Sequence, residues 1–166
     1  MKTLLFKVKL THDKRVWRTI ELLGSQTLDD LHGAIQAAFD FDADHLYSFF
    51  MSGKAWDLSD FEYHHPDADP QTPLWTTIRT LMATIRGIHP EPRRPATAVR
   101  LDALHLKPKQ RFLYLFDYGD EWRFDVEFVG EGTPETADYP RLVDARGEAP
   151  AQYTCDDDED RELPAP

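Results

Sequence analysis

The amino-acid sequence predicts an α+β fold in which a helix packs on a sheet. Residues 4–10 and 111–129 alternate apolar with polar side chains, which is the pattern of half-buried strands. Between these regions, residues 28–39 place apolar side chains at helical spacing. With 166 residues, of which 41% are hydrophobic and 12% aromatic, the chain is long enough to form one domain with its own core.

The N-terminal elements are predicted to be a hairpin, a helix and a third strand. The stretches "LLFKVKL" and "VWRTIELL" are typical of two strands joined by turn residues. Thr27 is placed to cap the following helix, with Asp30 as the acidic member of a weak capping box. Residues 45–51, "HLYSFFM", are rich in aromatic side chains and strand-like. The helix should pack on the sheet through Leu28, Leu31, Ile35, Ala38 and Phe39.

Residues 52–100 are predicted to be an insertion that carries a second amphipathic helix. The helix is expected to start after Pro73 and to stop near Gly87 and Pro90. Residues 74–100 contain five arginines and one acidic residue, a basic island of +4 in an acidic protein. The simplest interpretation is that the apolar stripe packs on the domain, and the alternative is a surface for a partner or a dimer. The stripe consists of Leu74, Ile78, Leu81, Met82, Ile85 and Ile88.

The stretch "RFLYLFDYGDEWRFDVEFV", at residues 111–129, predicts two more strands joined by a loop. A two-residue loop would place Phe116 opposite Arg123, an arrangement that is hard to bury. A loop with an odd number of residues lets aromatic and aliphatic side chains face each other, and such pairs stabilise a sheet. We therefore predict the odd loop, with the pairs Phe116–Trp122, Tyr114–Phe124 and Phe112–Val126.

This order of elements is the pattern of a β-grasp or ubiquitin-like domain, with a mixed sheet, one packed helix and an inserted helix. We expect residues 1–154 to form a single α+β domain that includes the helical insertion 52–100. Residues 155–166 carry six acids and one arginine and are expected to be a disordered acidic tail.

Charge and cysteine content exclude several classes of protein. The formal net charge of −11 argues against a general nucleic-acid binder, because phosphate contacts need a basic surface. No apolar run approaches the length of a membrane span, and Lys7 and Lys9 interrupt the apolar stretch that a signal peptide would need. Cys155 is the only cysteine, so no internal disulfide can form. These features predict a cytoplasmic protein.

Four separated blocks resemble one known family. The blocks are "VWRTIEL", "TLDDLHGAIQAAFDFDADHLYSF", "RFLYLFDYGDEWRFDVEF" and "YPRLVDARGEAPAQY". In the same order and with similar spacing, they resemble the plasmid pRiA4b ORF-3-like family, related to the TnpR-like accessory proteins of some insertion sequences. The resemblance covers most of residues 4–50 and 101–153. It implies a bacterial protein with a β-grasp-like α+β fold, from a family associated with mobile elements and without an established biochemical activity.

The chain departs from that family's pattern at two places. The sequence His45-Leu46-Tyr47 stands where the family usually has His-Leu-His, and "GEAPAQY" replaces a stretch that is usually rich in cysteine. A metal or redox role for those cysteines therefore does not transfer to this chain.

Asp117, Asp120 and Glu121, in "FDYGDEW", are the strongest candidates for chemistry. Carboxylates within reach of one another can share a proton or bind a hard cation, and Asp117 and Glu121 are placed to face each other across the loop. The favoured interpretation is nevertheless an ordinary turn, because Asp and Gly tolerate positive φ and Asp bonds its own backbone.

Two histidines and one tryptophan complete the candidate cluster. His32 lies on the first predicted helix and His45 begins the next strand, so the fold could bring them close, while Trp122 ends the carboxylate motif. No metal-binding spacing such as HExxH is present, and ordinary hydrogen-bonded histidines are the simpler interpretation. We assign no catalytic, cofactor-binding or metal-ligating residue, and we expect no cofactor.

The sequence favours a non-enzymatic protein-interaction module, with a protein partner or self-association through residues 74–88 and no membrane or nucleic-acid partner. Enzymatic activity stays open. The alternative is a metal-dependent hydrolase that uses Asp117, Asp120 and Glu121 with His32 or His45.

Overall fold

The computed structural model describes residues 1–57, 61–68, 73–88 and 93–153. The acidic segment 155–166 lies outside the described residues, and so does its predicted disorder. The strands are β1 (Thr3–Leu10), β2 (Trp17–Leu23), β3 (Tyr47–Phe50), β4 (Glu62–His64), β5 (Arg93–Pro95), β6 (Arg111–Phe116), β7 (Trp122–Gly132) and β8 (Arg141–Arg146). The helices are α1 (Leu28–Phe39) and α2 (Pro73–Ile85), with short 3-10 turns at Pro66–Ala68, Ala96–Ala98 and Leu101–Leu104.

Eight strands form one sheet in the order β5-β4-β3-β6-β7-β1-β2-β8. All pairings from β4 to β8 along this order are antiparallel, and the outermost pair, β4 with β5, is parallel. The α+β class predicted from the sequence is therefore confirmed, and the sheet is mixed. This topology does not confirm the narrower β-grasp prediction.

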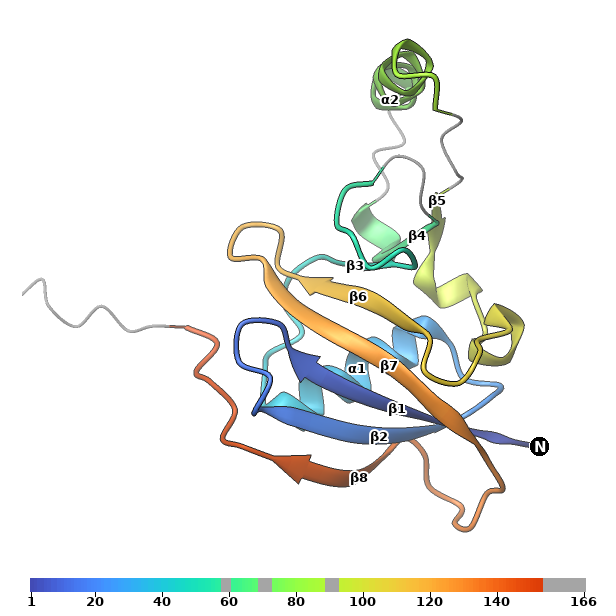
Figure 1. The fold of residues 1–166 in the computed structure, drawn as a ribbon, viewed down its shortest axis with the longest axis vertical. Helices are drawn as coiled ribbons and strands as arrows, with labels where there is room; N and C mark the ends of the chain where they lie inside the picture. Colours follow the sequence, from blue (N-terminus) through green and yellow to red (C-terminus); the bar gives the residue numbers. More distant parts are fainter. Residues whose placement is uncertain (58–60, 69–72, 89–92, 154–166) are drawn as a thin grey trace, which may run out of the picture.

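Helix α1 covers one face of the sheet, and the core lies between them (Figure 1). Alternate side chains of β1, including Phe6 and Val8, point into this core and are fully buried. The capping box forms as predicted, because the Thr27 side chain accepts from the Asp30 backbone N–H while the Asp30 carboxylate accepts from that of Thr27. The helix ends at Asp40, whose backbone is left-handed.

The hairpin formed by β6 and β7 has the predicted register. Its loop, residues 117–121, has an odd number of residues, and Phe116 lies opposite Trp122 and Tyr114 opposite Phe124. These aromatic rings line the core face of the sheet. Strand β8, which begins within "YPRLV" and pairs with β2 at the sheet edge, was not predicted from the sequence.

The described part of the insertion 52–100 forms an arm that projects from the sheet. Strands β4 and β5 connect the arm to the sheet, and we call them its legs. Because these strands are parallel, a crossover must join them, and the segment with α2 supplies it. In Figure 1, α2 stands away from the sheet. The interpretation that its apolar stripe packs on the domain is wrong for three of the described side chains, whereas Ile78 and Ile88 are half-buried. Leu81, Met82 and Ile85 are 57%, 53% and 76% exposed.

Among the described residues, no helix is long and apolar enough to cross a membrane.

We predict that Gly147→Ala lowers the free energy of unfolding by about 2 kcal/mol. Gly147 has φ +76°, and a Cβ there would lie 3.0 Å from Val16 Cγ2 and 3.1 Å from the backbone oxygen of Arg15. Gly33→Ala is the matched control, because Gly33 lies within α1 and a Cβ there would meet nothing within 4 Å. Urea denaturation should show that Gly33→Ala is more stable than the unmodified protein by about 0.5–1 kcal/mol. Equal effects at the two sites would contradict the argument.

Candidate functional site

The "FDYGDEW" loop is built around Asp117. Its carboxylate Oδ1 accepts from the backbone N–H of Gly119 at 2.8 Å and of Asp120 at 3.4 Å. Its own N–H donates to the carbonyl of Leu46 at 2.9 Å, which ties the loop to the segment before β3. Asp117 and Glu121 both have left-handed backbones, with φ of 56° and 52°. This is the geometry of a turn that Asp stabilises through its own backbone.

Glu121 has donors of its own. Its carboxylate accepts from the Arg123 guanidinium at 2.6 Å and from the indole N–H of Trp56 at 3.2 Å. The bond from Arg123 is the main reason why the pKa of Glu121 is lowered. The carboxylates of Asp117 and Glu121 therefore accept from different donors, and the prediction that they face each other stays a prediction.

His45 is the candidate residue that the fold does bring to Asp117. Its Nε2 lies 3.6 Å from Asp117 Oδ2 and 3.6 Å from Asp44 Oδ1. The Tyr153 hydroxyl donates to Asp44 at 2.7 Å and lies 3.3 Å from His45 Nε2. The bond to Asp44 raises the pKa of Tyr153 to about 12 and lowers that of Asp44. The Tyr153 hydroxyl thus donates its proton to the Asp44 carboxylate. These contacts attach the C-terminal segment to the loop before β3.

His32 lies in a different place, inside the core. Its Nδ1 is 2.7 Å from the hydroxyl of Tyr114, which also accepts from the Gln36 amide at 2.8 Å. Its ring stacks on that of Tyr47, with the centroids 3.9 Å apart, and the Tyr47 hydroxyl donates to Asp29. Burial lowers the pKa of His32 to about 4, against an opposing effect of Asp29. His32 and His45 each lie about 6 Å from the Phe116 ring, but one faces the core and the other faces solvent.

The candidate residues therefore do not form one site. Asp120 is exposed at the loop tip. Trp122 packs on Phe41, with ring centroids 4.9 Å apart, and also meets His12. In the part of the chain that the structure describes, no group of three or more His, Cys, Asp or Glu side chains is placed to hold a metal ion.

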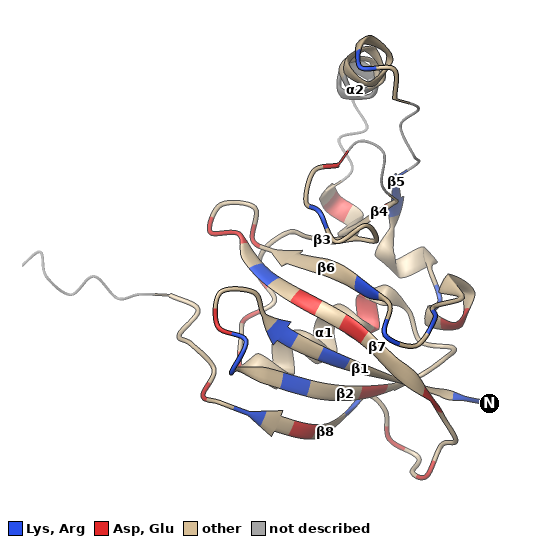
Figure 2. Cartoon of the chain, in the orientation of Figure 1, with Lys and Arg blue, Asp and Glu red and all other residues tan. Residues whose placement is uncertain are grey.

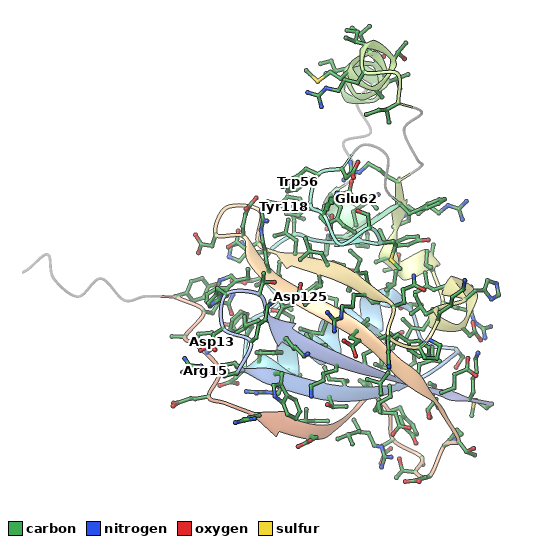
Figure 3. The ribbon with its side chains drawn as sticks, in the orientation of Figure 1. Asp13, Arg15, Trp56, Glu62, Tyr118 and Asp125 are labelled. Atoms are coloured by element: carbon green, nitrogen blue, oxygen red, sulfur yellow. The ribbon has the colours of Figure 1, made fainter. Side chains whose placement is uncertain are left out.

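Sequence reasoning missed an aromatic cluster on the face of the sheet opposite α1. Trp56 meets Phe50 and Tyr118 edge-on, with centroids 5.4 Å and 5.1 Å apart. Its indole is 47% exposed, and its φ of 61° is rare for a bulky residue. Figure 3 shows Trp56 and Tyr118 close together below α2. The signal available in the sequence was a tryptophan in a polar loop, and its backbone conformation could not be read from it.

A buried ion pair, also missed, joins the two legs of the arm. The Glu62 carboxylate on β4 accepts two bonds from Arg93 on β5, both at 2.7 Å. The Ser48 hydroxyl donates to it at 2.9 Å and lies 2.8 Å from the hydroxyl of Tyr118. The Glu62 side chain is almost fully buried, so this network fixes where the arm leaves the sheet.

Charges on the exposed face of the sheet are interspersed. Figure 2 shows basic colour on β1 and both basic and acidic colour on β2 and β7. Lys7 lies opposite Glu127, and Lys9 lies opposite Asp125, in the pairing of β1 with β7. By contrast, the described part of α2 shows only basic colour in Figure 2.

An α+β protein with this sheet has a counterpart among solved structures. The crystal structure of MM3350, a protein of unknown function from Methanosarcina mazei Go1, matches with a TM-score of 0.60 and 23% sequence identity. The match covers 89% of this chain and 71% of that chain. At this identity the likeness shows a shared fold. The comparison with curated proteins found no match.

The family follows from the sequence match. The model of the family described as "Plasmid pRiA4b ORF-3-like protein" matches residues 2–155. The chain therefore belongs to the plasmid pRiA4b ORF-3-like family, as the four sequence blocks indicated.

Proposed function

We propose that the chain is a non-enzymatic protein-interaction module in which α2 binds a partner protein that presents apolar and acidic groups. The observation that carries this proposal is the exposure of Leu81, Met82 and Ile85 on a helix that stands away from the sheet. Apolar side chains grouped on one exposed face of a helix are typical of recognition by a groove in a partner.

The charge of residues 74–100 defines the chemistry of the partner. Residues 74–100 carry five arginines and one acid, and Arg86 is exposed directly after α2. An acidic surface around an apolar groove would complement this arm, whereas a basic one would repel it.

The other predictions made from the sequence have less support. The hydrolase alternative lacks support, because Asp117 and Glu121 accept from different donors and Asp120 is exposed at the loop tip. β-grasp kinship, a TnpR-like accessory role and an association with mobile elements stay predictions.

Site-specific photo-crosslinking tests the proposal. A photoreactive amino acid in place of Met82, in the native host, should give an adduct with a protein whose crosslinked peptide contains both apolar and acidic residues. Leu81→Glu with Ile85→Glu should abolish the adduct, because both changes place charge in the apolar stripe. Thr80→Glu, an exposed position on the other side of the helix, should leave it. The proposal fails if no adduct forms or if the Leu81 and Ile85 changes leave it intact.

A further inference from the structure

The exposed face of α2 has a counterpart on the same chain, which we call the Trp56 patch (Trp56, Tyr118, Asp120 and Glu121). The Trp56 indole is half exposed and rigidly placed, since it packs on Tyr118 and donates to Glu121. Tryptophan is the residue type most enriched among those that dominate binding energy at interfaces. A strained backbone that is kept at an exposed side chain is itself an indication of function.

The charges of the two surfaces are opposite. Asp120 is exposed beside Glu121 and forms no ion pair among the described residues. Arg86, at the end of α2, is likewise exposed and forms no ion pair within the described ranges. Residues 74–100 carry +4, so with a total of −11 the remaining residues carry −15. Of that −15, residues 155–166 carry −5, so the rest of the chain outside residues 74–100 carries −10. Arg93 and Arg100 are paired with Glu62 and Asp102, which leaves Arg86 as the exposed arginine beside α2 that a second, acidic copy would meet.

We propose that α2 of one copy docks on the Trp56 patch of a second copy, and that the second copy's α2 docks on the first. Leu81, Met82 and Ile85 would cover the Trp56 indole, and Arg86 would pair with Asp120. Both contacts are identical, so the exchange closes as a dimer with twofold symmetry and does not extend into a filament.

We take a second copy as the occupant because Asp120, in its Trp56 patch, is opposite in charge to Arg86. In one copy, the apolar face of α2 and the Trp56 indole are exposed at the same time, so neither covers the other. The inference rests on the proposed role of α2 in binding proteins and names its partner.

A charge exchange between two variants of the full-length protein tests the dimer. Light scattering after size exclusion should give twice the 19.2 kDa of one chain for the unmodified protein. Asp120→Lys and Arg86→Glu should each be monomeric, because each places like charges at both contacts. An equimolar mixture of the two should recover the dimer, because every contact then joins one acidic and one basic residue. Asp138→Lys, the same charge change at an exposed position between β7 and β8, should stay dimeric.

Trp56→Gly provides a second test that does not depend on charge. Glycine suits the left-handed backbone at this position, so the fold should be kept while the dimer is lost. The inference is overturned if the unmodified protein is monomeric or if the mixture of charge variants stays monomeric. In either case, a crosslink from position 82 to a different acidic protein would leave the proposed function standing.

Discussion

Acidification from pH 7 to pH 4 is expected to lower the free energy of unfolding by about 3 kcal/mol through His32 alone. Burial against Tyr47 and Tyr114 lowers the pKa of His32 to about 4, from an ordinary value of 6.5. Below pH 6.5 the unfolded chain therefore binds a proton that the folded chain does not. Stability is complete above pH 6.5 and is lost as the pH falls toward 4.

Urea denaturation across this pH range should isolate the effect by comparison with His32→Gln. Because the variant lacks the titrating ring, it should lose about 3 kcal/mol less stability than the unmodified protein between pH 6.5 and pH 4. His12→Gln, at an exposed histidine, is the control and should follow the pH dependence of the unmodified protein. If His32→Gln and the unmodified protein lose the same stability over this range, His32 is not buried as the structure shows.

The helix start and the hairpin register could be predicted from the sequence where local signals agree. The capping box of Thr27 and Asp30 fixes the start of α1, and the aromatic pairing of Phe116 with Trp122 fixes the register of the last hairpin. These features depend on neighbours in sequence or on one strand pair, which is what periodicity reports. Strand β8 was harder to predict, because it is a sheet edge whose exposed Leu142 and Val143 do not alternate with polar residues.

The candidate site was predicted in part. Asp117 and His45 do meet, since the β6–β7 loop is bonded to the segment before β3. The direction of a side chain within a loop depends on backbone dihedrals that composition does not report. Asp117, Glu121 and Trp56 all have left-handed backbones, the two carboxylates accept from different donors, and Trp56 is 47% exposed. Glu62 and Arg93 lie 31 residues apart in the sequence, so no local pattern could predict their pairing.

Arg93→Met is expected to lower the free energy of unfolding by about 3 kcal/mol. The change leaves the carboxylate of Glu62 buried without its charged partner, with Ser48 as the remaining side-chain donor. The cost of such a group comes from the loss of hydration that the ion pair had offset. Arg111→Met is the matched control. Arg111 pairs with Glu127 at the same 2.7 Å, but its own side chain is 68% exposed, so its loss should change stability by less than about 1 kcal/mol.

The double variant Arg93→Met with Glu62→Gln separates the charge from the packing. A neutral amide in place of the carboxylate removes the unpaired charge, so the double variant should be more stable than Arg93→Met alone. A double variant that is less stable would contradict the buried-charge argument.

Because β4 and β5 are the two legs of the arm, Arg93→Met should also loosen the position of α2. Dimer formation should then weaken in Arg93→Met and recover in the double variant, whereas Arg111→Met should leave it unchanged. The ion pair thus links the stability of the sheet edge to the placement of the helix that we propose as the binding element.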